Sequence, residues 1–240
     1  MSLPELRLRA VNDRPLRSDG QFVLYWMVAN RRTTWNFSFE RAIELARELK
    51  KPLVVLEALR VGYRWASDRL HAFVVQGMAD NERALAKTPV LYYPYLEPEP
   101  NAGHGLLTAL AKHACAVVTD DFPCFFLPRM IALVGRQIDV RLEAVDSNGI
   151  LPMRAAPQLF TRAFSFRRYL QKSLRPHLEA LPQANPLARV KLPTMTELPA
   201  RITRQWPSAD VAALAKDLAL LRQFPIDHTV GLASMTGGAQ

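Results

Sequence analysis

The sequence has few of the residues that build metal sites and phosphate-binding loops. Of 240 residues only two are cysteines, Cys115 and Cys124, and neither has a Cys or His neighbour at metal-ligand spacing. The five histidines form no H-x-x-x-H pair. No P-loop, G-x-G-x-x-G turn or G-x-S-x-G elbow is present. We therefore expect no metal site, and the sequence offers no catalytic residue of these types.

Long apolar runs are also lacking. The longest, residues 22–29, is too short to cross a bilayer and suits a buried strand. The first residues contain no signal-peptide core. We expect a cytoplasmic protein without a membrane partner, in which buried free thiols fit better than a disulfide. Acidic residues are outnumbered, and the net charge of +9 favours a polyanionic partner such as DNA or RNA, although many basic proteins bind neither.

Short apolar segments alternate with helical patterns through the first 150 residues. Several segments are nearly continuous in apolar and β-branched residues, which is typical of strands buried on both faces of a parallel sheet. The expected strands are residues 22–29, 52–58, 90–95, 115–119 and 140–145. The expected helices are residues 37–50, 67–86, 105–113 and 127–135. This alternation predicts an α/β fold with a doubly wound, mostly parallel, five-stranded sheet of the Rossmann-like kind.

Polar caps support the two longer helices. Asn36 or Ser38 can cap the first, and Ser67 or Asp68 can start the second.

The pattern changes after about Pro152. Helical pieces at residues 158–174 and 209–223 are separated by stretches rich in proline, and no further strand follows. We expect an α/β domain over residues 1–152 and a helical, proline-containing linker over residues 153–240 that wraps its surface. The last residues, GLASMTGGAQ, bring no concluding element, and on this ground we expect a truncated chain.

Two clusters follow expected strands, where ligands bind in doubly wound sheets. After the first strand come arginines, a tryptophan and amides, which suit a planar anionic ligand or a solvated loop. After the fourth come two carboxylates and aromatic residues, which suit a flat pocket or a helix cap with aromatics packed on the core. The candidate cofactor-binding residues are Asn30, Arg31, Arg32, Trp35, Asn36, Asp120, Asp121, Phe122 and Phe125.

A third cluster lies on the helix that follows the sheet. It consists of Arg162, Arg167, Arg168 and Arg175, with Phe164, Phe166 and Tyr169 among them. These arginines are candidates for contact with DNA or with another domain. The alternative is a solvated helix face.

Several segments resemble class II cyclobutane-pyrimidine-dimer photolyases, of the photolyase and cryptochrome family. The most specific is NDRPLRSDGQFVLYWMVANRR, and the similarity continues through FERAIELARELKKPLVVLEAL and GYRWASDRLHAFVVQGM. It extends through VVTDDFP, VDSNGILP with FTRAFSFRRYL, and the linker-like WPSADVAAL and FPIDHTVGLASMTGG, and so spans nearly the whole chain. The DDFPCFF loop departs from the family's shorter, more basic segment, which bears on the identity of any antenna.

The resemblance implies a flavoprotein lyase that repairs pyrimidine dimers in DNA. In the family, an N-terminal α/β domain can hold an antenna chromophore, a deazaflavin or a folate, and a helical C-terminal domain binds FAD. Reduced FAD donates an electron to a dimer flipped from the DNA stack. The expected partners are DNA that contains pyrimidine dimers and the C-terminal FAD domain, which we expect to be absent here, so that the chain alone is inactive.

Two other functions stay open. One is a non-enzymatic, photolyase-derived module that binds a chromophore or nucleotide. The other is an unrelated α/β enzyme that uses Asp120 or Asp121 as acid or base. The lesion type, cyclobutane or (6-4), and the oligomeric state do not follow from the sequence.

Overall fold

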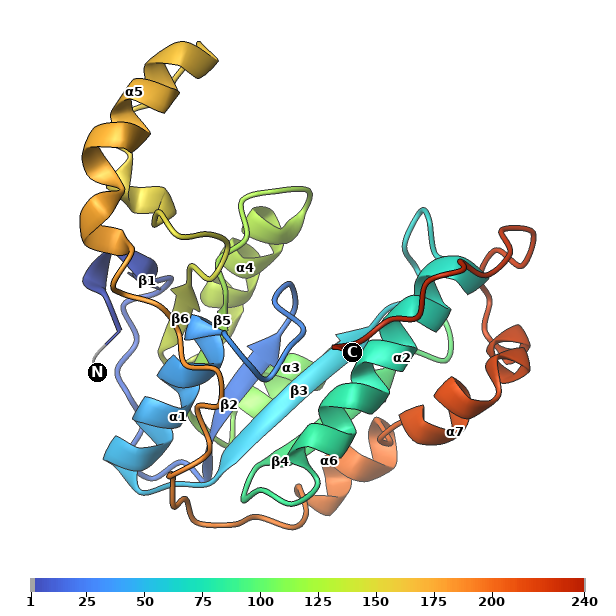
Figure 1. Ribbon diagram of the computed structural model, residues 1–240. Coiled ribbons are helices and arrows are strands. Elements are labelled where there is room, and N and C mark those ends of the chain that lie inside the picture. Colours follow the sequence, from blue (N-terminus) through green and yellow to red (C-terminus); the bar gives the residue numbers. More distant parts are fainter. Residues whose placement is uncertain (1–2, 240) are drawn as a thin grey trace.

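The core of the protein is a twisted sheet, seen in a computed structural model that describes residues 3–239 (Figure 1). Its strands lie in the order β1-β6-β5-β2-β3-β4. They are β1 (Leu8–Ala10), β2 (Phe22–Met27), β3 (Leu53–Leu59), β4 (Leu91–Leu96), β5 (Ala114–Asp120) and β6 (Leu142–Val145). The strands β2 to β6 are parallel, and β1 pairs with β6 in the antiparallel direction.

The predicted α/β fold and mostly parallel sheet are confirmed, but the number of strands was wrong. Among the described residues the sheet has six strands, not five. The additional strand β1 has three residues and lies at the sheet edge, where Arg9 pairs with Ala144. A segment this short cannot show the alternation by which a strand is recognised. It forms because its backbone can pair with the edge of β6.

The strand order creates a switch point between β2 and β5. The chain proceeds outward from β2 through β3 to β4 on one side, and from β5 to β6 on the other. Loops that leave β2 and β5 therefore diverge to opposite sides, which opens a crevice beyond the carboxyl ends of the two strands. Doubly wound proteins bind their ligands in such crevices.

Helices cover both faces of the sheet. They are α1 (Phe37–Leu49), α2 (Asp68–Leu85), α3 (Leu106–Ala111) and α4 (Leu127–Gln137). Alternate residues of β2 serve the two layers: Phe22, Leu24 and Trp26 pack with α3 and α4, and Val23, Tyr25 and Met27 pack with α1. Every side chain of β2 is buried, which explains its continuous apolar sequence.

The predicted caps are present. The side chain of Asn36 accepts hydrogen bonds from the amides of Ser38 and Phe39, and that of Ser67 accepts one from Leu70. These bonds satisfy amide groups that have no partner within the first turn of a helix. Asn36 and Ser67, not Ser38 or Asp68, are the capping residues.

The part after residue 152 runs along the outside of the sheet layers. Its helices are η2 (Met153–Ala155), α5 (Ala163–Ser173), η3 (Arg175–His177), α6 (Ala200–Gln205), α7 (Val211–Lys216) and η4 (Leu218–Gln223). The helix predicted at 209–223 is divided at Asp217, and α6 was not predicted. The division into domains at residue 152 stays a prediction.

This region is anchored at two places and free at a third. Ile202 and Trp206 join the cluster beneath α3, while Leu214 and Leu221 pack on α2. By contrast, α5 has no buried residue and projects away from the sheet (Figure 1). Within residues 3–239, no helix combines the length and apolarity that a membrane span requires.

Candidate functional site

The crevice at the switch point is closed by the side chain of Asp120. This residue ends β5 and is fully buried. Its Oδ2 accepts hydrogen bonds from the amides of Val28, Ala29 and Asn30 at 2.9, 2.8 and 3.0 Å. Its Oδ1 accepts one from the Tyr25 hydroxyl at 2.8 Å. Three converging amides make an anion site, and here the protein's own carboxylate occupies it.

The hydroxyl of Tyr25 completes this arrangement. Burial, and then the charge of Asp120, raises the pKa of Tyr25 well above its usual value, so the phenol stays neutral and donates to the carboxylate. Nδ2 of Asn36 donates to the Tyr25 oxygen at 3.0 Å, and to the carbonyls of Asn30 and Arg32. Asn36 therefore holds the loop after β2 as well as capping α1.

The arginines of this loop bind groups of the protein. Arg31 donates to Glu57 Oε1 at 3.0 Å and to the carbonyl of Ala58. Arg32 donates to the carbonyl of Trp35. Trp35 is half exposed, with a left-handed φ of 49°. The loop is thus fixed internally, and the residues that face solvent widely are Thr34 and Trp35.

Glu57 is a buried carboxylate in the middle of this network. It accepts hydrogen bonds from Arg31, from Asn81 Nδ2 at 2.9 Å and from the Tyr92 hydroxyl at 2.7 Å. Burial and the adjacent Glu57 raise the pKa of Tyr92, which remains a neutral donor. Glu57 was not among the predicted residues. It is the one charged residue in the apolar run LVVLEAL, and a carboxylate buried in such a strand requires hydrogen-bonding or ionic partners, which is the sequence signal that could have identified it.

Asp121 is held by arginines from two other segments. Arg9 Nη2 lies 3.1 Å from Oδ1, and Arg154 Nη1 lies 2.7 Å from Oδ2. Burial opposes ionisation, but the hydrogen bonds from Arg9 and Arg154 outweigh it and lower the pKa of Asp121. Since the oxygens of both aspartates are occupied, the structure leaves neither free to act as a general acid or base.

Exposed aromatic rings form a rim at the carboxyl edge of the sheet. Tyr63 and Trp65 follow β3, with ring centroids 5.4 Å apart. Phe126 follows β5 and lies 6.2 Å from Tyr63, so the two loops meet above the end of β2. Phe125 is 78% exposed, and Phe122 is half-buried. We call Tyr63, Trp65, Phe125 and Phe126 the aromatic rim.

One prediction about the cysteines was wrong. Cys115 is buried within β5, as expected, but Cys124 is exposed in the loop that carries Phe125. The described residues contain no disulfide and no cluster of potential metal ligands.

A small pocket lies at the same edge, beyond the ends of β2, β3 and β4. It has a volume of about 230 Å³. Apolar walls come from Trp26, Leu56, Tyr95, Leu106 and Leu107. Polar groups at its margin come from Arg60, Glu97, Asn101 and His104. A few polar groups around flat apolar walls are typical of small-molecule sites, although this volume lies below the range of roughly 300–1,000 Å³ that is usual for them.

Glu97 shapes this pocket although it is almost completely buried. Its Oε2 accepts from the amide of Val61 at 3.0 Å, and its Oε1 accepts from the amide of Gly103 at 3.2 Å. It thereby joins the loop after β3 to the loop after β4. Burial, then the neighbouring Glu97, raises the pKa of Tyr95, so this wall of the pocket carries a neutral phenol.

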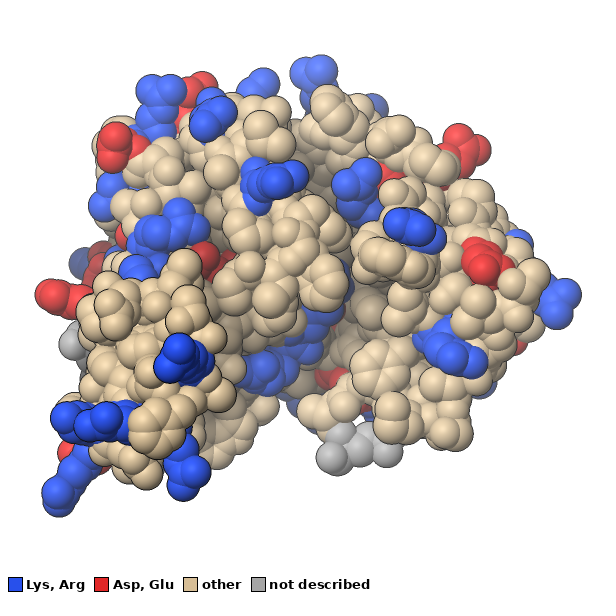
Figure 2. Space-filling model, turned by 90° about the horizontal axis from the view of Figure 1, so that it is seen from above, with Lys and Arg blue, Asp and Glu red and all other residues tan. Residues whose placement is uncertain are grey.

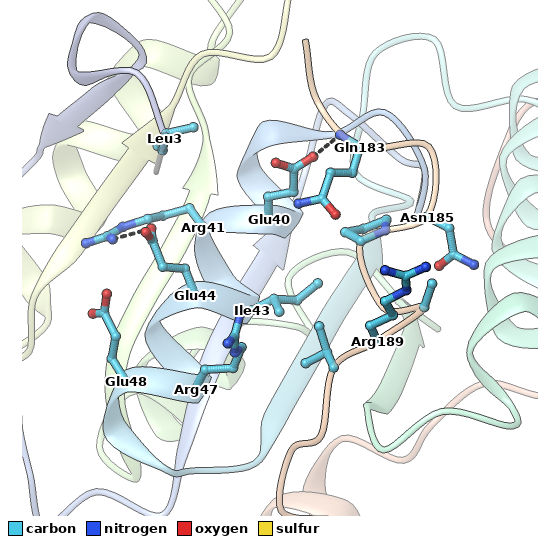
Figure 3. A pocket seen from close by; sticks show the side chains of 13 residues that line it. Leu3, Glu40, Arg41, Ile43, Glu44, Arg47, Glu48, Gln183, Asn185 and Arg189 are labelled. Carbon is cyan, nitrogen blue, oxygen red and sulfur yellow. Dashed lines mark hydrogen bonds and ion pairs between the residues drawn. The ribbon is translucent and has the colours of Figure 1, made fainter. Parts of the chain in front are cut away.

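A larger hollow lies between α1 and the segment 183–190 (Figure 3). Its volume is about 810 Å³. Glutamates and arginines line it together: Glu40, Glu44 and Glu48 occupy successive turns of α1, and Arg47 and Arg189 lie close by (Figure 3). The mixed charge and the lack of aromatic walls make it a poor match for a planar chromophore.

Seen from above, the carboxyl edge is hollowed, and Lys and Arg outnumber Asp and Glu on this face (Figure 2). The predicted DNA or interdomain arginines, Arg162, Arg167, Arg168 and Arg175, are all exposed on or next to α5. The structure brings the predicted cofactor residues together at the ends of β2 and β5. Their role in binding a chromophore stays a prediction.

These features define an α/β protein of the doubly wound class, in which the Asp120 carboxylate occupies the amides of residues 28–30 at the switch point. No family model matches the chain. Over 150 residues, 62% of the chain, it is 31% identical to the deoxyribodipyrimidine photo-lyase of Methanothermobacter thermautotrophicus. The match covers 33% of that protein. The chain thus has a distant similarity to a deoxyribodipyrimidine photolyase, and its α/β sheet is consistent with the N-terminal domain of such a protein.

Proposed function

We propose that the chain forms the α/β part of a deoxyribodipyrimidine photolyase, a lyase that repairs pyrimidine dimers in DNA with light and reduced FAD. The 31% identity over 150 residues carries this proposal. Because the match covers only 33% of the relative, we assign FAD, dimer binding and electron transfer to the part of such a protein that the match does not include.

The geometry of the switch point supports this division. FAD bound in the usual dinucleotide manner would place its pyrophosphate against amides after the first strand. Asp120 already accepts from the amides of Val28, Ala29 and Asn30, and a phosphate there would meet a buried negative charge. The described residues therefore do not fit FAD at this position, and we derive no step of repair from them.

An antenna chromophore fits this chain better. The pocket beside Trp26 and Tyr95 offers flat apolar walls, and its volume of about 230 Å³ suits one conjugated ring system, with the rest of the ligand in the open. The Arg60 guanidinium at its margin would favour an anionic group, such as the ionised ring of a deazaflavin or the glutamate tail of a folate. In this role the chain's residues bind and orient a light-absorbing ring and shield it from water.

Binding can be tested with Leu107, a half-buried residue of α3 that lines the pocket. We expect a deazaflavin or methenyltetrahydrofolate to quench the tryptophan fluorescence of the chain on binding. Leu107→Trp should fill the pocket and weaken binding at least 10-fold. Leu133→Trp, on an exposed position of α4, is the matched control and should bind like the wild type. Absence of binding by the wild type, or equal binding by both variants, would reject the antenna site.

Repair itself needs a separate experiment. We expect the full coding region that contains this chain to restore survival of photolyase-deficient cells after ultraviolet irradiation, only under blue light. Chromophore binding without such rescue would favour the alternative function, a photolyase-derived binding module without enzymatic activity. Rescue in the dark would contradict both.

A further inference from the structure

Most of the net positive charge of the chain comes from one segment, residues 147–178. Residues 147–178 contain six Lys and Arg and no Asp or Glu, whereas the remaining sequence has 25 Lys and Arg against 22 Asp and Glu. The segment therefore contributes +6 of the net +9. Only Arg154 of the six takes part in an ion pair among the described residues, with Asp121. The other five are Arg162, Arg167, Arg168, Lys172 and Arg175.

The helix α5, within this segment, has two different faces. On one face the rings of Phe166 and Tyr169 lie 5.4 and 5.1 Å from the ring of Phe160, and the Tyr169 hydroxyl donates to the carbonyl of Ala155. These contacts fasten α5 to the segment that leads into it. Its apolar residues on this side are thus already engaged within the protein.

The other face is free and carries both charge and an aromatic ring. Phe164, Arg168 and Lys172 follow one another at four-residue intervals, and Arg175 comes next on the same side in η3. Phe164 is 68% exposed, and the Arg168 guanidinium lies 5.8 Å from the centre of its ring. We call Phe164, Arg168, Lys172 and Arg175 the basic stripe. It extends for roughly 17 Å, at 1.5 Å per residue.

We propose that the basic stripe binds single-stranded nucleic acid, through phosphates at Arg168, Lys172 and Arg175 and through a base stacked on Phe164. Proteins that bind single strands combine a basic track with exposed aromatic rings on which bases stack. A stripe of roughly 17 Å would span about five nucleotides of a strand stacked with the rise of B-DNA, about 3.4 Å per nucleotide, and fewer of an extended strand. The proposal requires neither light nor chromophore, so it stands or falls apart from the function proposed above.

The arrangement of the stripe favours nucleic acid over a lipid surface. A helix that lies in a membrane interface separates a broad apolar face from its charged face. In α5 the exposed ring of Phe164 lies on the charged face itself, while Phe166 and Tyr169 face Phe160. An aromatic ring beside guanidinium groups on one face can contact a base and the neighbouring phosphates of a nucleic-acid strand at the same time.

The test measures binding of a fluorescein-labelled 20-nucleotide poly(dT) by anisotropy, in the dark and without chromophore. The triple variant Arg168→Gln, Lys172→Gln and Arg175→Gln should bind at least 10-fold more weakly. Its slope of log affinity against log salt should be smaller by about 2, since each lost phosphate contact removes about 0.7. Phe164→Ala should weaken binding about 5- to 100-fold, as expected for one stacked base. Because no residue of α5 is buried, these variants should fold normally.

The control keeps the change in charge and moves it elsewhere. The triple variant Arg201→Gln, Lys216→Gln and Arg222→Gln alters exposed residues outside the stripe, and should bind like the wild type. Three results would overturn the proposal: no binding at low salt, equal losses in both triple variants, or stronger binding to a blunt duplex than to poly(dT). Binding to anionic phosphatidylserine vesicles but not to poly(dT) would show that the stripe recognises lipid instead.

Discussion

The structure makes a quantitative prediction for Asp120→Asn. The carboxylate is fully buried and accepts four hydrogen bonds, three from backbone amides and one from Tyr25. A bond to a charged group stabilises by about 1.5–3 kcal/mol and a neutral bond by about 0.5–1.5 kcal/mol, so about 1 kcal/mol is lost for each. The side chain of asparagine has one oxygen that can accept hydrogen bonds, whereas the carboxylate of Asp120 accepts through both. The neutral amide is, however, less costly to bury than the charged carboxylate.

The sum predicts that Asp120→Asn lowers the free energy of unfolding by about 2–4 kcal/mol. For a chain of this size the melting temperature should fall by roughly 5–15 °C. Urea denaturation followed by circular dichroism measures the free energy, and a thermal scan measures the midpoint. Asp139→Asn is the control, because this side chain is 79% exposed and forms one ion pair within residues 3–239, with Arg14 at 3.4 Å. A loss below about 0.5 kcal/mol for Asp120→Asn, the range of surface changes, would refute the role assigned to the carboxylate.

Three further changes test other parts of the structure. Glu57→Gln weakens three hydrogen bonds to a buried carboxylate and should lower the free energy of unfolding by about 2–3 kcal/mol in urea denaturation. The pKa of Asp121 in the folded protein lies below its ordinary value of 3.8, so the stability that its carboxylate contributes is present above pH 3.8 and is lost as the pH falls below that value. In Asp121→Asn the free energy of unfolding should therefore depend less on pH in that acid range. Burial lowers the pKa of His71 from 6.5, so the unfolded chain takes up the proton first and stability falls as the pH drops below 6.5. The melting temperature should therefore be lower at pH 5.5 than at pH 7.5, and His71→Leu should make this difference smaller. An unchanged difference would contradict the role assigned to His71.

The sequence predicted the strands well because the sheet is buried on both faces. Segments such as Phe22–Met27 are continuously apolar, and this pattern can be recognised in the sequence without knowing which strands lie beside them. The short elements were not predictable in this way. Strand β1 depends on the edge of β6, and α6 depends on the cluster beneath α3 that receives Ile202 and Trp206.

The candidate cofactor residues lie at the strand ends, as expected, but their role in binding a ligand stays a prediction, and none of them lines the pocket proposed for the antenna. That ligands bind beyond strand ends follows from the fold, and the residues chosen there do lie together. Which polar atoms remain free depends on contacts between distant segments, such as Asp120 with residues 28–30, and spacing in the sequence does not reveal these. The pocket lined by Tyr95 and Leu107 was missed because its walls come from segments far apart in the sequence, namely β2, the ends of β3 and β4, and α3.

The most direct test of the account is a crystal structure of the chain grown with a deazaflavin. We predict electron density for the ring between Trp26 and Tyr95, with Asp120 still bound to the amides of residues 28–30. Density against those amides, with the Asp120 side chain displaced, would contradict the central claim that the switch point is closed by the protein's own carboxylate.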